Sequence, residues 1–120
     1  MPYTIGEVAR MMNIAPSTLR YYEKEGLLSL GVRASNGQRT YTDDDIATLS
    51  IIEYLKFCGL PLKEIRSFLP LIRPGGETLS ARRDILAKER DNVRAQIAAL
   101  QTKLERLEFG CWFYETAQQY

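Results

Sequence analysis

The sequence has no histidine and only two cysteines, Cys58 and Cys111, among its 120 residues. Histidine is the usual acid–base group near neutral pH and a frequent zinc ligand, and two thiols cannot complete the tetrahedral ligand set of a zinc ion. A glycine-rich phosphate-binding loop is also absent. We therefore expect no enzymatic activity, no cofactor and no metal, and we interpret both cysteines as free thiols.

Long hydrophobic runs are missing as well. No stretch approaches the roughly 18 apolar residues of a membrane span, and no basic leader precedes an apolar segment, so we expect a cytoplasmic protein without membrane contact. The net charge is only +1, and DNA binding would depend on where the basic residues lie. With 45% hydrophobic and 26% charged residues, the chain has the composition of a globular protein of one domain with an appendage.

Two short helices are predicted near the N-terminus. Thr4 and Glu7 have the spacing of a capping box and precede an apolar stripe of about two turns. After a break at 13–15, Pro16 opens a second helix, and Gly26 is well placed to end it. Two short helices joined by a three-residue turn are typical of a helix-turn-helix.

The outward face of the second predicted helix is polar. If Leu19 and Tyr22 turn inward, the residues left outside are Ser17, Thr18, Arg20, Tyr21 and Lys24. Such side chains can neutralise phosphates and donate to base edges when a helix lies in the major groove of DNA. The alternative from composition alone is an ordinary solvated helix face.

Residues 29–41 are rich in turn formers and predict a small two-stranded wing, with Asn36-Gly37 as the hairpin signal. Its candidate donors to DNA are Arg33, Asn36, Gln38, Arg39 and Tyr41. The alternative is a solubilising edge hairpin in which Arg39 and Tyr41 only pack on the rest of the domain.

Two more helices are predicted before a proline- and glycine-rich joint. Thr42 and the acidic run 43–45 start a third helix, which ends at Gly59. Helix capping explains these three aspartates better than a metal site does. The apolar residues of this helix are Ile46, Leu49, Ile52, Leu55 and Phe57. Pro61 opens a fourth short helix, and we place the end of a DNA-binding domain, residues 1–75, in the joint that follows.

Residues 76–120 are predicted to be an antiparallel coiled-coil dimerisation helix, 78–109, followed by an aromatic tail. Apolar residues recur there with the spacing of a coiled coil: Leu86, Val93, Ile97, Leu100, Leu104 and Leu107. We expect an antiparallel homodimer, because the head offers no helix of comparable length; a helix folded back on its own head is the alternative. The fold class is thus mainly α: a winged helix-turn-helix head plus a long C-terminal coiled-coil helix.

Three stretches resemble the MerR family of bacterial regulators. They are Tyr3-Thr4-Ile5-Gly6-Glu7-Val8-Ala9, Thr18-Leu19-Arg20-Tyr21-Tyr22-Glu23 with Gly26-Leu27-Leu28, and Asn36-Gly37-Gln38-Arg39-Thr40-Tyr41. The likeness continues through Gly59-Leu60-Pro61-Leu62-Lys63-Glu64-Ile65 and covers nearly the whole chain.

The resemblance implies a sequence-specific transcriptional regulator. A dimer would bind a pseudo-palindromic element of double-stranded promoter DNA between over-spaced −35 and −10 hexamers, then bend and untwist it so that RNA polymerase engages both. By similarity Arg20, Tyr21 and Arg39 would contact phosphates or bases, and Tyr41 would support the wing. The alternative function, one without DNA binding, is an adaptor that binds other proteins through the coiled coil.

The signal that such a regulator reads is left open by the sequence. Metal sensing in this family needs cysteines near the start of the long helix, where this chain has Thr78-Leu79-Ser80-Ala81, so the resemblance implies a short-tailed, non-metal type. Candidates for a redox signal or a small organic effector are Cys111, Trp112 and Tyr114, with Cys58 as a weaker one. The alternatives are a buried inert Cys58 and aromatic rings that cap the dimer.

Overall fold

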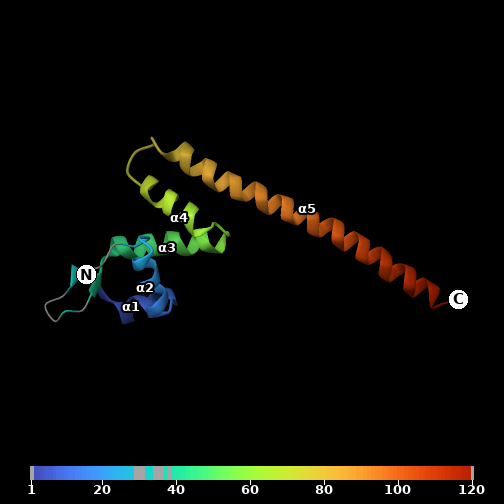
Figure 1. The fold of residues 1–120 in the computed structure, drawn as a ribbon, viewed down its shortest axis with the longest axis horizontal. Helices are drawn as coiled ribbons and strands as arrows, with labels where there is room; N and C mark the ends of the chain where they lie inside the picture. Colours follow the sequence, from blue (N-terminus) through green and yellow to red (C-terminus); the bar gives the residue numbers. More distant parts are fainter. Residues whose placement is uncertain (1, 29–31, 34–36, 38, 120) are drawn as a thin grey trace. The chain divides into compact units, whose positions relative to one another are not determined.

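The computed structural model of the chain describes residues 2–28, 32–33, 37 and 39–119. Its contacts divide the chain into two units, Met1–Arg82, here called the head, and Arg83–Tyr120. The elements in chain order are β1 (Tyr3–Thr4), α1 (Ile5–Met12), α2 (Pro16–Lys24), β2 (Val32–Arg33), β3 (Arg39–Tyr41), α3 (Asp43–Phe57), α4 (Leu62–Phe68), the 3₁₀ turn η1 (Leu69–Leu71) and α5 (Leu79–Ala117). The architecture is mainly helical, as predicted (Figure 1).

Capping boxes start two of the head's helices. The Thr4 hydroxyl accepts from the backbone N–H of Glu7, whose carboxylate accepts from the N–H of Thr4 at 2.9 Å. That backbone hydrogen bond holds the pKa of Glu7 below its usual value. Thr42 and Asp45 repeat the arrangement at the start of α3. Both helix starts were predicted. A capping box stabilises a helix start because it provides acceptors for N–H groups that no helical carbonyl can reach.

The helix-turn-helix of α1 and α2 is confirmed. Asn13 ends α1 in the left-handed region at φ 55°, and its N–H donates to the carbonyl of Ala9. Pro16 stands in the first turn of α2, where a missing N–H costs nothing. Past the end of α2, Gly26 has φ 75°, a conformation that a side chain with a Cβ would strain. The chain then returns to the core through Leu27 and Leu28, both buried.

The wing is part of a three-stranded antiparallel sheet with the order β1-β3-β2. Val32 pairs with Thr40, and Tyr3 pairs with Tyr41 on the other edge of β3. The sequence predicted only the two wing strands. A strand as short as β1, directly before a helix cap, has no alternation to reveal it, and its pairing with β3 is long-range.

One hydrophobic core joins the elements of the head. Its buried apolar residues are Val8, Ile14, Leu19, Tyr22, Leu27, Leu28, Tyr41, Leu49, Ile52, Leu55, Leu60, Ile65 and Phe68. Phe57, one of the apolar residues of α3 named from the sequence, is not part of this core and is 92% exposed. Phe57 follows the buried Leu55 by two residues, which turns its side chain to the opposite side of the helix. The helix ends there, two residues before the predicted Gly59.

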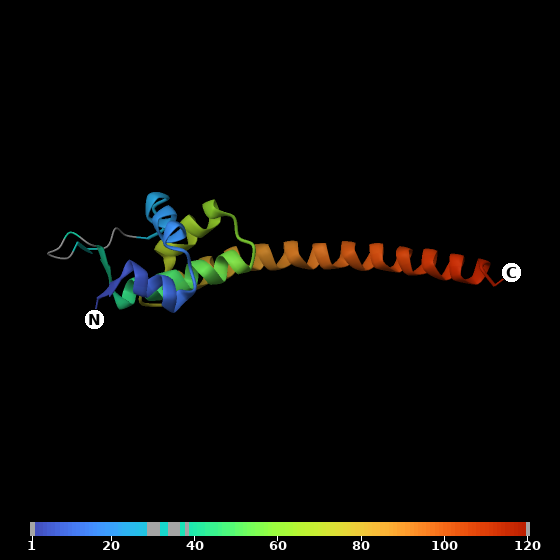
Figure 2. The same ribbon diagram turned by 90° about the horizontal axis from the view of Figure 1, so that it is seen from below.

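Helix α5 extends well past its predicted end at 109 and runs unbroken to Ala117 (Figure 1 and Figure 2). The predicted helix ended just before Gly110. Glycine inside a helix costs only about 1 kcal/mol relative to alanine, too little to end a long helix. None of the described residues of α5 is buried. Its apolar stripe lies open, with Val93 38%, Ile97 60%, Leu100 59% and Leu104 49% exposed.

Candidate nucleic-acid interface

The second helix of the head presents most of the face predicted for DNA. Leu19 and Tyr22 are buried and hold α2 against the core. The predicted side chains Ser17, Arg20, Tyr21 and Lys24 are exposed, and Thr18 is half-buried. Among the described residues, no hydrogen bond or ion pair engages the guanidinium of Arg20 or the ammonium of Lys24. The two cations are thus available to an anionic partner such as a phosphate backbone.

Contacts from the neighbouring helices fix α2 in place. Lys56 of α3 donates to the Tyr22 hydroxyl at 2.7 Å, and that hydroxyl donates to Glu53 at 2.9 Å. Burial is the main cause that raises the pKa of Tyr22, while the hydrogen bond with Tyr22 raises the pKa of Lys56. From α4, Arg66 binds the carboxylate of Glu25 at 2.5 Å and its carbonyl at 3.0 Å. The C-terminal half of α2 is therefore anchored to α3 and α4 behind it.

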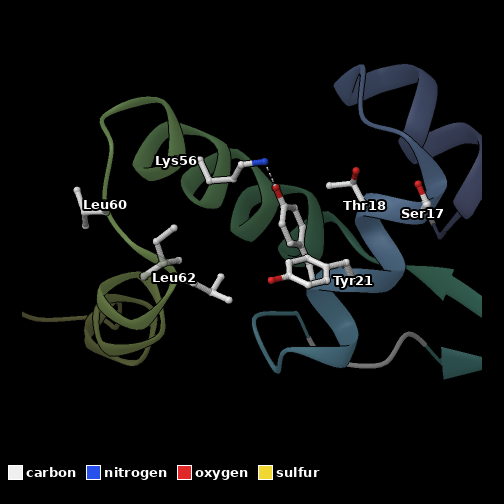
Figure 3. A pocket seen from close by; sticks show the side chains of 8 residues that line it. Ser17, Thr18, Tyr21, Lys56, Leu60 and Leu62 are labelled. Carbon is white, nitrogen blue, oxygen red and sulfur yellow. Dashed lines mark hydrogen bonds between the residues drawn. The ribbon is translucent and has the colours of Figure 1, made fainter.

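An open pocket of about 440 Å³ lies in the head between α2 and the turn that joins α3 to α4. Figure 3 shows Ser17, Thr18 and Tyr21 along one side of it and Lys56 reaching across from α3. Leu60 and Leu62 form the opposite wall. Sequence reasoning did not single out Lys56, which lies 32 positions after Lys24 and approaches α2 only in the fold.

The wing is tied to α2 by a buried carboxylate. Glu23 has a side chain only 2% exposed, and it accepts hydrogen bonds from the Arg39 guanidinium and the Tyr41 hydroxyl. Burial and the carboxylate of Glu23 raise the pKa of Tyr41 to about 12, so this phenol stays protonated and donates. A buried carboxylate is stable only when hydrogen-bond donors pair with it, as Arg39 and Tyr41 do here. The cluster therefore fixes β3 to α2.

This cluster changes the reading of two predicted wing residues. Tyr41 is fully buried, so its prediction as a donor to DNA is not supported; it packs on the head, which was the alternative. Arg39 keeps 34% of its side chain exposed but is paired with Glu23. Arg33 is on β2, its side chain not described, and Asn36 and Gln38 lie outside the described residues.

Sequence reasoning missed Glu23, although a signal for it existed. Leu19, Tyr22 and Glu23 stand at i, i+3 and i+4, so the periodicity that turns the first two inward turns Glu23 inward as well. A buried carboxylate needs partners. The partners, Arg39 and Tyr41, lie on a strand 16 and 18 positions later in the sequence. Helical periodicity cannot predict such distant contacts.

The candidate signal residues fall in both units. Cys58 is half-buried at the C-cap of α3, whereas Cys111 is exposed on α5. Trp112 and Tyr114 are also on α5, 57% and 70% exposed, and not on a separate tail beyond the helix as expected. The Trp112 ring lies 5.8 Å from that of Phe109. In the part of the chain described, no three His, Cys, Asp or Glu side chains gather to hold a metal ion.

The membrane prediction can be checked on the helices themselves. Over residues 2–28, 32–33, 37 and 39–119, no helix is both long and apolar enough to cross a membrane.

A helix-turn-helix with an exposed second helix, a small antiparallel wing and a long helix together define a winged helix-turn-helix DNA-binding protein. Two family descriptions match the chain: MerR HTH family regulatory protein over residues 3–71, and MerR, DNA binding over residues 46–108. The chain belongs to the MerR family of transcriptional regulators.

Individual relatives agree with this assignment. An uncharacterized HTH-type transcriptional regulator of Haemophilus influenzae is 37% identical over 118 residues, which are 98% of this chain and 87% of that protein. The crystal structure of HiNmlR, a MerR family regulator lacking the sensor domain, bound to promoter DNA, is similar at 37% identity and a TM-score of 0.67; 100% of this chain and 95% of that chain are covered. PbrR691 from Ralstonia metallidurans CH34, solved in complex with lead(II), has 27% identity and a TM-score of 0.63, with 88% and 84% covered.

These likenesses, together with the fold, identify a DNA-binding transcriptional regulator of the MerR type and not an enzyme. The predicted fold class, family and DNA-binding role are confirmed.

Proposed function

We propose that this protein acts as a homodimer that binds a pseudo-palindromic element in the spacer of a promoter and distorts it. Bending and untwisting would bring over-spaced −35 and −10 hexamers into a geometry that RNA polymerase can engage. The observation that carries the proposal is the exposed face of α2, with Arg20 and Lys24 unpaired among the described residues and the back of the helix anchored.

The DNA contact follows from this geometry. Helix α2 would enter the major groove, where Ser17 and Tyr21 reach base edges or phosphates and Arg20 and Lys24 neutralise phosphates. The wing would follow the flanking backbone with Arg33, Asn36 and Gln38. The Glu23 cluster fixes β3, the strand at the base of the wing, to α2, which supports a joint contact of α2 and the wing with DNA.

The exposed stripe of α5 supports the proposed dimer. None of this apolar stripe is buried, and it is exposed from Val93 to Leu107. A helix with a narrow apolar stripe and polar flanks is marginal on its own in water. An antiparallel pair of these helices would bury the stripes and supply the two heads that a symmetric operator needs. The seam residues are Leu86, Val93, Ile97, Leu100, Leu104 and Leu107.

Footprinting on the DNA upstream of the protein's own gene tests the promoter proposal. We expect a symmetric protected site with cleavage enhanced at its centre, where the duplex is deformed. Arg20→Ala should weaken protection, while Lys88→Ala, the same charge change on the exposed outer face of α5, should leave it unchanged. Protection of a single half-site, or an undistorted centre, would contradict the proposal.

We further propose that the regulator is of the non-metal type and responds to a small organic molecule or a redox signal. The donor set supports this: the chain has no histidine, its two thiols lie in different units, and the described residues hold no cluster of three metal-binding groups. The candidate residues are Cys111, Trp112, Tyr114 and Cys58.

In vitro transcription tests the signal. Reduced and oxidised protein are compared with a Cys111→Ser variant on the same promoter, and a redox response should disappear in the variant. Equal transcription from all three would exclude redox sensing through this thiol and leave the aromatic residues as the candidates. Retention of one lead(II) or zinc ion per protomer after dialysis would overturn the non-metal type.

A further inference from the structure

The pocket between α2 and the turn that joins α3 to α4 has a size suited to a small organic molecule. Its volume is about 440 Å³, and pockets that bind such molecules hold roughly 300–1,000 Å³. All of its lining residues belong to the head, so its walls do not depend on α5. Figure 3 shows hydroxyl groups of α2 on one side, leucines on the other, and Lys56 reaching across from α3.

One part of the pocket is apolar and aromatic. Leu60 and Ile65, which line it, are buried, and Leu62 is half-buried. The rings of Tyr21 and Tyr22 line it from α2, with centroids 6.3 Å apart and planes tilted by 54°. Aliphatic and aromatic surface in this combination suits a flat apolar body. A phosphate group of DNA has no apolar part and would leave this surface uncovered.

The cation of the pocket is Lys56. Its ammonium donates to the Tyr22 hydroxyl at 2.7 Å and lies 3.6 Å from the carboxylate of Glu53. The hydrogen bond with Tyr22 raises the pKa of Lys56, so this side chain stays charged at neutral pH. An ammonium has three N–H donors. With one donor on Tyr22 and 47% of its side chain exposed, Lys56 can still bind an anion in the pocket.

We propose that this pocket binds a small aromatic carboxylate, with the anionic group on Lys56 and the ring between Tyr21 and Leu62. The carboxylate gains a charge-assisted hydrogen bond, and the ring covers the apolar surface, so each part of the ligand meets a matching part of the pocket. The hydroxyls of Ser17 and Thr18 add donors on the α2 side.

The ligand would exclude DNA from the same head. Ser17 and Tyr21 line the pocket and also belong to the exposed face of α2 that we propose for DNA. A ring lying against Tyr21 therefore occupies space that the DNA needs. This inference rests on the proposed DNA contact of α2 and deepens it by naming a class of signal molecule and the place where it binds. It differs from a signal at Cys111 or Trp112, which lie on α5 outside the head.

Two matched probes test the pocket on the full-length protein without DNA. Naphthalene-2-carboxylate has the proposed chemistry, and naphthalene-2-carboxamide has the same shape without the charge. Titration calorimetry should give the carboxylate an affinity about tenfold higher, because only it pairs with the ammonium of Lys56. Lys56→Met keeps an apolar stem and should make the two affinities equal. Lys63→Met, at an exposed lysine of α4 that does not line the pocket, is the matched control and should keep the difference.

A second substitution keeps the test decisive if Lys56→Met does not fold. Leu62→Ala shortens the apolar wall and should weaken both probes by the same factor, roughly three- to tenfold, leaving the ratio of their affinities unchanged. Melting curves show which variants fold. Equal affinity of the parent for the two probes, an unchanged ratio in folded Lys56→Met, or unchanged affinities in Leu62→Ala would each overturn the proposal.

Gel shifts on the upstream DNA test the exclusion. At about ten times its dissociation constant, naphthalene-2-carboxylate should weaken DNA binding about tenfold, and the carboxamide at that concentration about twofold. Unchanged DNA binding by the ligand-bound protein would overturn the exclusion. Inorganic phosphate that binds as tightly as the carboxylate would also overturn the proposal, because the pocket would then be an anion site that a DNA phosphate fills. Absence of a footprint without ligand would instead overturn the proposed function and leave the calorimetry standing.

Discussion

The head and α5 use apolar residues in opposite ways. In the head, Leu49, Ile52 and Leu55 of α3 are fully buried within the same chain. In α5, leucines at similar helical spacing are about half exposed, and none of its described residues is buried. The head therefore holds its fold through internal contacts, whereas α5 carries an apolar surface that is left exposed in the single chain.

This difference separates two sources of stability. The free energy of unfolding of the head should not depend on protein concentration, because its contacts are intramolecular. That of a paired α5 should rise with concentration, as it does for any folded state that depends on association. Substitutions placed in one region or the other should show this contrast directly.

The largest effect is expected from a charge in the seam. Leu100→Asp would place two carboxylates near the centre of the paired helices, where they lose water without a partner. We expect loss of the dimer and a drop of about 100-fold or more in affinity for a two-half-site operator, because the second head no longer binds as part of the same molecule. Sedimentation and gel-shift titration measure the two effects.

Ala99→Asp is the control for that experiment. It adds the same charge one residue away, on the outer face of α5, where Ala99 is exposed. The dimer and the affinity should stay within about twofold of the parent. Equal damage from both variants would mean that the stripe is not the dimer contact.

A core truncation in the head should come next in size. Leu49→Ala removes a fully buried side chain and should cost about 2–5 kcal/mol of unfolding free energy, at any protein concentration. Leu100→Ala, by contrast, should destabilise in a way that fades as concentration rises. Denaturant melts at two concentrations a hundredfold apart distinguish them; the same concentration dependence for both would break the contrast between the regions.

Loss of the buried carboxylate of the head should have a smaller effect. Glu23→Ala leaves the Arg39 guanidinium and the Tyr41 hydroxyl without their acceptor, and should cost about 1–3 kcal/mol. Chemical denaturation measures it. Glu105→Ala, on the exposed surface of α5, should change stability by less than about 0.5 kcal/mol. If the two substitutions cost the same, the cluster does not hold the wing.

The contrast also explains what the sequence could predict. Local signals succeeded: the capping boxes at Thr4 and Thr42 mark helix starts because each is complete within four residues. Signals that depend on distant partners failed, since nothing near β1 announces its pairing with β3, and nothing near Glu23 announces Arg39. The end of α5 was missed for a different reason, because one glycine was given more weight than a helix of that length allows.

For the interface, the sequence identified the exposed side of α2 correctly because helical periodicity alone separates Arg20 from Leu19. The sequence could not show which arginine is unpaired and which forms an ion pair with a buried carboxylate. Arg20 and Arg39 look alike in the sequence, yet only Arg39 is held by a buried carboxylate.

That distinction gives a prediction about salt dependence. Arg20→Ala should remove one phosphate contact and lower the slope of log affinity against log salt by about 0.9. Arg39→Ala should lower the slope by clearly less, since Glu23 already neutralises this charge, and it should weaken binding mainly by loosening the wing. Titrations at four salt concentrations give the slopes. Equal slopes for the two variants would show that Arg39 contacts phosphate as Arg20 does.

The smallest expected effect concerns α2, which like α4 starts at an N-cap residue that makes no side-chain cap hydrogen bond. Thr4 and Thr42 cap α1 and α3, but Ala15 stands at the N-cap of α2 with extended backbone, φ −65° and ψ 141°, and offers no acceptor. Ala15→Thr should therefore stabilise the head by about 0.5–1 kcal/mol, since its hydroxyl can accept from an N–H of the first turn. Ala15→Val has the same shape without the hydroxyl, so the difference between the two melting curves isolates the cap. Identical curves would mean that the first turn of α2 gains nothing from an acceptor, and that its contacts with the core already determine where the helix begins.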